Sequence, residues 1–203
     1  MGGRPLLRRG LLGGSLSLGA LSVAHAQPST ADYAVFTEYS PQNKKLLPGW
    51  NRRIFTDTDS RKGNGIQCDF KTGIVSLVPG TYHLSGISIV AYDSSTAPPE
   101  MTTPRSPAAA GYCRLRRVTG EPGPEQIGLH DIDNADASVI CIGSPSSANL
   151  APSVFQAFCE VTQPTRLLLE HQAGSNPQDV LLRVFAGDSK WHAVARLAIR
   201  RLP

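Results

Sequence analysis

The chain has 203 residues, of which 40% are hydrophobic and 18% are charged, and its formal net charge is +4. Arg4, Arg8 and Arg9 supply three of these charges within the first ten residues, so the rest of the chain has a net charge of +1 (+4 minus 3). Because the rest of the chain is nearly neutral, its charge gives no indication of a nucleic-acid partner.

Residues 1–26 have the organisation of a secretory signal peptide. A basic start is followed by an apolar stretch over residues 11–23 and by the small-residue cleavage site Ala24-His25-Ala26. We therefore expect an exported protein, periplasmic or secreted, that begins at Gln27 and keeps no transmembrane anchor. The sequence Arg8-Arg9-Gly-Leu-Leu is similar to a bacterial twin-arginine export motif, and the general secretory route stays equally open.

The remaining residues, 27–203, predict one all-β domain. Short runs of alternating apolar and polar residues are separated by Gly, Pro, Asn and Asp clusters, and no helical stripe occurs. This pattern is typical of an antiparallel two-sheet β-sandwich or a barrel. The predicted strands are 33–39, 65–70, 73–78, 80–92, 112–117, 138–143, 153–161, 165–172, 180–185 and 191–202.

The last predicted strand shows the alternation most clearly. Its core face is expected to hold Trp191, Leu197 and Ile199, and its opposite face holds His192, Arg196 and Arg200. The second set is a candidate surface for an anionic ligand, and a solvated face or a subunit contact is the preferred interpretation.

Two segments between strands are rich in Pro, Ser, Thr, Gly and Asp. Residues 93–111 and 119–137 are expected to be exposed loops, because their composition offers little apolar surface to bury.

Four cysteines follow the signal segment, and an even number in an exported chain favours disulfides over free or metal-binding thiols. A hairpin joining the strands of Cys141 and Cys159 would hold these two residues too far apart to bridge. If Cys113 and Cys141 reach the same end of the sandwich, the pairing is Cys113–Cys141 and Cys68–Cys159.

Three carboxylates, Asp131, Asp133 and Asp136, lie close together in the second loop and are oxygen ligands of the kind calcium prefers. An EF-hand is excluded, because its glycine and terminal glutamate positions hold Asp136 and Ile142. A looser calcium site is the weaker alternative to a solvated loop, and no cofactor is predicted.

No catalytic motif is recognisable. The chain has no Gly-x-Ser-x-Gly, no Ser-x-x-Lys and no His-x-His, and its histidines at 83, 130, 171 and 192 are scattered singly, as surface or interface residues would be. A small carbohydrate-active or metal-dependent jelly-roll enzyme of the cupin kind is the alternative to a non-enzymatic module.

The segment Gly65–Gly86 resembles a motif of complement C1q-like globular heads. The matching positions are Thr72, Gly73, Ile74, Pro79, Gly80 and Tyr82. The segment Phe155–Gln172 is similar to the strand pair that follows in that family. The resemblance implies a C1q/TNF-like jelly roll in an exported bacterial protein. It also implies a homotrimer that acts as a non-enzymatic module and binds an extracellular protein or glycan.

Overall fold

The computed structural model describes residues 31–39, 44–45, 49–90, 111–120, 126–128, 137–146, 151–173, 181–182 and 193–203. The predicted signal peptide and most of the two predicted loops lie outside these residues. Within the second predicted loop, residues 119–137, the described segment Gln126–Gly128 is a short strand, so the loop prediction is wrong for these three residues. Every regular element of the described part is a β-strand.

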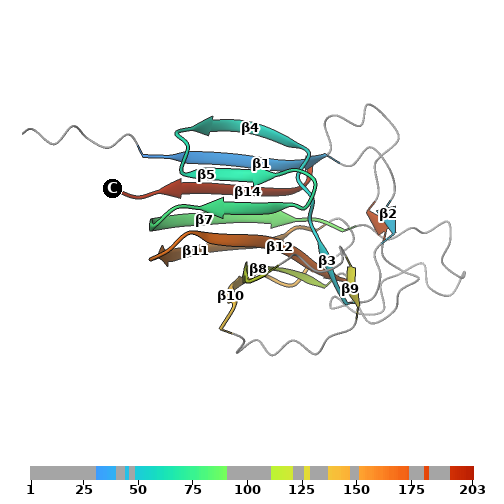
Figure 1. Ribbon diagram of the computed structural model, residues 1–203. Helices are drawn as coiled ribbons and strands as arrows, with labels where there is room; N and C mark the ends of the chain where they lie inside the picture. Colours follow the sequence, from blue (N-terminus) through green and yellow to red (C-terminus); the bar gives the residue numbers. More distant parts are fainter. Residues whose placement is uncertain are drawn as a thin grey trace, which may run out of the picture.

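The strands form two antiparallel sheets that pack face to face (Figure 1). Sheet I has five strands in the order β11 (Ser153–Val161), β7 (Gly80–Ser88), β14 (Ala193–Arg201), β1 (Tyr33–Tyr39) and β4 (Asp57–Lys62). The main path of sheet II is β10 (Val139–Ile142), β8 (Tyr112–Val118), β12 (Thr165–Ala173), β3 (Gly49–Arg52) and β9 (Gln126–Gly128). Strand β6 (Ile74–Leu77) also pairs with β12, and β5 (Ile66–Asp69) pairs with β6. A separate short pair joins β2 (Lys44–Lys45) and β13 (Leu181–Leu182).

Alternation along the strands of sheet I explains how the core forms. In β11 the odd-numbered residues from Ser153 to Val161 turn towards sheet II, and the even-numbered residues are exposed. In β14 the core residues are Ala195, Leu197 and Ile199, while Arg196 and Arg200 are exposed. The predicted faces of the last strand are therefore confirmed for its described residues, and Trp191 lies outside them.

Strand β12 is buried on both faces. Leu167, Leu168 and Leu169 are 0% exposed, as are the two polar residues that follow them, Glu170 and His171. Strand β8 pairs along one edge of β12, and β6 and β3 follow one another along the other edge. This position makes β12 the central strand of sheet II.

The turn between β5 and β6 joins the strands predicted at 65–70 and 73–78. The Asp69 carboxylate accepts hydrogen bonds from Lys71 N (2.9 Å) and Thr72 Oγ1 (2.6 Å), and Asp69 O accepts from Gly73 N (2.8 Å). These hydrogen bonds to the charged carboxylate hold the pKa of Asp69 below its usual value. Gly73 has φ +72°, and a Cβ there would lie 2.2 Å from Arg53 O, so the position requires glycine.

The all-β sandwich predicted from the sequence is confirmed, and the strands Tyr33–Tyr39 and Ser153–Val161 have the bounds predicted for them. Of the predicted strand 180–185 the structure describes only Leu181–Leu182. The short strands β2 and β9 were not predicted, and neither were β3 and β4. In β4, Asp57–Lys62, all six residues are polar and exposed, so no apolar alternation marks it as a strand.

Candidate functional site

The face of sheet I that points away from the core is the candidate site, and we call it the open face. Strand alternation places on it Tyr33, Val35, His83, Ser85, Ile87, Val154, Gln156, Phe158, Arg196, Ala198 and Arg200. Three of the apolar side chains are well exposed: Phe158 (70%), Val154 (45%) and Tyr33 (38%). These three side chains stand apart from one another, because Val154 and Phe158 are four residues apart on β11 and Tyr33 is on β1, three strands away.

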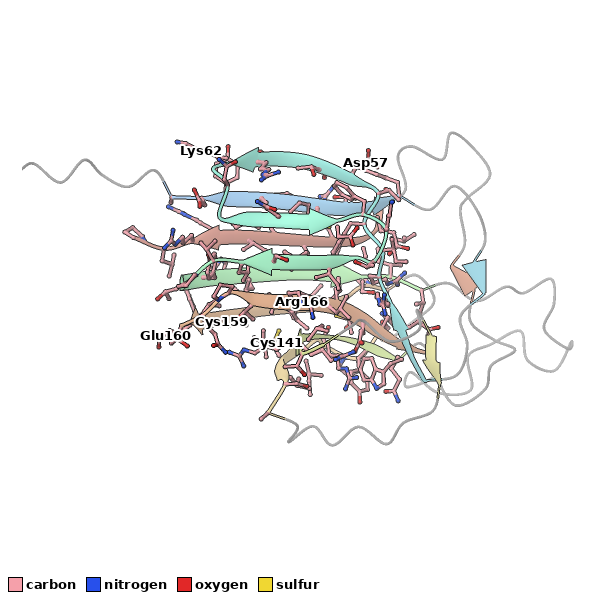
Figure 2. All side chains as sticks on the ribbon, viewed as in Figure 1. Asp57, Lys62, Cys141, Cys159, Glu160 and Arg166 are labelled. Carbon is pink, nitrogen blue, oxygen red and sulfur yellow. The ribbon has the colours of Figure 1, made fainter. Side chains whose placement is uncertain are left out.

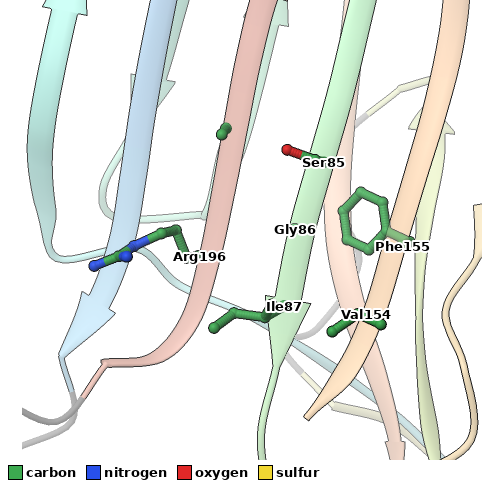
Figure 3. Close-up of a pocket in the computed structure, with 7 residues that line it drawn as sticks. Ser85, Gly86, Ile87, Val154, Phe155 and Arg196 are labelled. Carbon is green, nitrogen blue, oxygen red and sulfur yellow. The ribbon is translucent and has the colours of Figure 1, made fainter.

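Two adjoining hollows lie in the open face. The larger is about 330 Å³ and is bordered by Ile87, Val154 and Arg196 (Figure 3). The smaller, about 170 Å³, is bordered by Tyr33, Val35, His83 and Arg200. Ser85 and Ala198 line both hollows, and because these are short side chains between longer ones they form a depression.

The exposed Phe158 contacts His83 at the edge of this face. Its ring packs on His83 with centroids 5.1 Å apart, and Gln156 Nε2 lies 2.6 Å from His83 Nε2. The sequence signal for this residue was an aromatic side chain on the face of β11 that also carries Gln156 and Glu160.

Arg196, a candidate for an anionic ligand, is already paired. Its guanidinium lies 3.2 Å from the Asp59 carboxylate and also donates to Thr37 Oγ1 at 3.2 Å. Thr37 and Tyr39 both donate hydrogen bonds to the same carboxylate, at 2.7 and 3.2 Å. The side chain of Arg196 reaches over β1 rather than into the larger hollow (Figure 3). Asp59 therefore neutralises the cation, and it comes from β4, a strand the sequence did not reveal.

Arg200 lies on the open face beside the smaller hollow, as predicted, and makes no ion pair with a described residue. His192, the third residue of the predicted cationic face, lies outside the described residues. The structure thus brings Arg196 and Arg200 to one face, where Asp59 pairs with Arg196 and no described carboxylate pairs with Arg200.

A polar group bridges the two sheets inside the core. Ser88 Oγ on β7 lies 2.8 Å from His171 Nδ1 on β12 and accepts a hydrogen bond from Arg53 Nε at 2.8 Å. Arg53 also donates to Ile89 O at 2.5 Å and lies 3.8 Å from the Glu38 carboxylate. Burial lowers the pKa of Arg53, and the charge of Glu38 opposes this shift.

His171 is therefore a core residue, which corrects the expectation of a surface or interface histidine. A serine next to a histidine is a possible nucleophile and base, but Ser88 and His171 are both 0% exposed. Since a substrate cannot reach this pair in the folded chain, its role is to tie the sheets together.

The opposite face of β12 carries a buried carboxylate among arginines. Arg114 Nε donates to Glu170 Oε2 at 2.8 Å, and Arg116 Nε donates to Glu170 Oε1 at 2.8 Å. The Arg114 guanidinium also lies 4.0 Å from the centroid of the Trp50 ring. Glu170 and His171 point to opposite faces, as predicted for neighbours on a strand, but the ion pairs of Glu170 were not foreseen.

All four cysteines are free thiols in the structure, so the predicted Cys113–Cys141 and Cys68–Cys159 disulfides are wrong for this state of the chain. Cys141 pairs with Leu115 on β8, which makes Cys113 its diagonal neighbour. Diagonal neighbours stand about 7–8 Å apart, beyond the Cα separation of about 7 Å that a disulfide spans.

Cys68 and Cys159 are farther apart still. Cys68 is on β5, which packs over β1, whereas Cys159 is on β11, three strands away from β1 in sheet I. Three strand spacings at about 4.8 Å are roughly 14 Å. The hairpin assumed for Cys141 and Cys159 is also wrong, because β10 and β11 belong to different sheets, although their thiols lie near one another (Figure 2).

The calcium candidates Asp131, Asp133 and Asp136 lie outside the described residues. Within the described ranges, no group of three His, Cys, Asp or Glu side chains is placed to hold a metal ion. A search of the same ranges finds no helix with the length and apolar character needed to span a membrane.

The two packed antiparallel sheets define a jelly-roll β-sandwich, the fold class expected from the sequence. Three crystal structures of murine APRIL, of the tumour-necrosis-factor family, are similar to the chain at 11%, 12% and 11% sequence identity, with TM-scores of 0.48, 0.43 and 0.44. Each alignment covers 85% of this chain and 99% of the other. No protein-family model matches the sequence, and no curated protein does.

Proposed function

We propose that the chain is an exported, non-enzymatic interaction module that assembles into homotrimers through the open face and binds an extracellular protein or glycan. The observation that carries the proposal is the open face itself. It combines an exposed Phe158 with two hollows of about 330 and 170 Å³ on one sheet. Contact surfaces are typically enriched in such aromatic anchors.

The polar groups of the described part support a binding role over catalysis. The Ser88–His171 pair is inaccessible, and Glu170 is occupied by Arg114 and Arg116. A catalytic carboxylate or base needs to reach a substrate within hydrogen-bond distance. These buried groups instead stabilise the scaffold that presents the open face.

The trimeric state and the export of the chain rest on the sequence. The resemblance of Gly65–Gly86 to C1q-like heads supports three copies, and the organisation of residues 1–26 supports export. Removal of residues 1–26 from the protein found outside the cytoplasm, seen as an intact mass that begins at Gln27, is the expected result for export.

The mass of the purified protein in native buffer tests the assembly. Light scattering after gel filtration, at protein concentrations from about 1 to 100 µM, is expected to give three times the chain mass. A constant monomer mass over this range would contradict the proposal. The Arg200→Ala variant, which keeps the apolar part of the open face, tests whether the cation contributes to the contact.

A further inference from the structure

One row of side chains crosses the whole open face. The strand registers pair Phe158 with His83, His83 with Arg200, Arg200 with Tyr33 and Tyr33 with Lys62. Paired residues of antiparallel strands lie at one level along the strand direction. Phe158 therefore stands at the same level as Arg200 and Tyr33 but on the edge strand, β11.

Phe158 and the smaller hollow differ in shape. Phe158 is 70% exposed and projects from the edge strand, while the smaller hollow lies over β1, β7 and β14, between Tyr33, His83 and Arg200. The projection and the depression are different patches of one surface. Contacts between different patches of identical copies are head-to-tail, and they close into a ring when the rotation allows it.

Strand direction shows which rotation between two copies keeps Phe158 of one at the level of Arg200 in the other. Strand β11 is antiparallel to β7, and β7 is antiparallel to β14, so β11 and β14 run in the same direction. Rotation about an axis along the strands preserves both the direction and the level of every residue. It therefore brings Phe158 of one copy to the level of Arg200 in the next, whereas a two-fold axis perpendicular to the strands reverses the direction.

From this geometry we propose that Phe158 of each copy inserts into the hollow between Tyr33 and Arg200 of the next copy, around an axis along the strands. This inference rests on the proposed function and names its contact. Arg200 makes no ion pair with a described residue, so its guanidinium is available to pack on the incoming ring. Within its own copy the Phe158 ring contacts His83, with ring centroids 5.1 Å apart.

Truncation of Phe158 is the first test. Phe158→Ala is expected to raise the concentration at half-assembly by at least about tenfold, as truncation of an aromatic anchor does. The matched control is Phe70→Ala, because Phe70 is also exposed (43%) but lies outside the open face. Circular dichroism and thermal melting of both variants show whether each variant remains folded.

Cross-linking tests the partner of Phe158 directly. Within one copy, positions 158 and 200 are separated by two strand spacings, about 9.6 Å, which exceeds the roughly 7 Å that a disulfide spans. The double variant Phe158→Cys/Arg200→Cys can therefore bridge only between copies. Under oxidation with copper phenanthroline it is expected to give a covalent trimer on a non-reducing gel, and each single variant is expected to stay uncross-linked.

The outcomes separate this inference from the proposed function. If the wild-type protein is a trimer but Phe158→Ala assembles normally, or the double variant does not cross-link at a concentration where light scattering shows it assembled, the contact is wrong and the module remains an oligomer. Covalent dimers of Phe158→Cys alone would show a two-fold contact between edge strands and overturn the inference. A monomeric wild-type protein would overturn both.

Discussion

Replacing Glu170 with glutamine removes a carboxylate that holds Arg114 and Arg116, both at 2.8 Å, while the shape of the side chain is kept. Glu170 is 0% exposed, and the side chains of the two arginines are 10% and 21% exposed, so water does little to compensate. Removing one partner of a buried ion pair costs about 3–5 kcal/mol of unfolding free energy. At about 2–4 °C per kcal/mol for a domain of this size, the melting temperature should fall by about 6–20 °C.

The matched control is Glu160→Gln, which makes the same chemical change at an exposed position of β11 (Figure 2). Surface substitutions of this kind usually change the unfolding free energy by less than about 0.5 kcal/mol. Urea unfolding followed by circular dichroism measures both variants against the wild-type protein. Equal stability of Glu170→Gln and Glu160→Gln would refute the assignment of Glu170 as a buried counter-ion.

Two further predictions concern the β5–β6 turn and the cysteines. In urea unfolding, the Gly73→Ala variant should be less stable than the Gly120→Ala variant by about 1–3 kcal/mol. Both glycines have positive φ, but of the two only Gly73 would place a Cβ against a backbone atom, Arg53 O. An equal loss of unfolding free energy in the two variants would exclude the clash. Burial raises the pKa of Cys68 and Cys141 from 9.0 to about 12, so both thiols should resist iodoacetamide at pH 8 until the protein unfolds. The thiols of the unfolded chain ionise at a lower pH than those of the folded chain, so the unfolding free energy should fall as the pH rises from about 9 towards about 12. Fast alkylation of either thiol in the native protein would contradict its burial.

The sequence contained enough to predict most of the sandwich. The strands of Phe155 and Leu197 alternate cleanly, since each has one buried and one exposed face. Strand β12 was also predicted, although it is buried on both faces, because its leucines lie between turn residues. Strand β4 was missed because it has no buried face, and its stability comes from pairing with β1.

The candidate site was harder to predict, because it depends on which strands are neighbours. The sequence placed Arg196 and Arg200 on one face, but Asp59, which neutralises Arg196, is more than 130 residues away in the chain. The disulfide prediction failed for the same reason: it assumed a hairpin between β10 and β11, and these strands belong to different sheets. Alternation gives the face of a side chain, and only the strand order gives its neighbours.

The centre of sheet I is β14, whose residues 193–201 follow all other described strands in the chain, and its two neighbours are β7 and β1. Until this segment has been synthesised, β1 and β7 each have an edge with no partner, and sheet I is divided into two separate pairs, β11 with β7 and β1 with β4. Unpaired strand edges in an incomplete chain are sites for association with other chains. Sheet I is therefore continuous only when β14 is in place between β7 and β1. If the chain is exported as proposed, a twin-arginine route, which carries folded proteins, would require β14 to be paired before export.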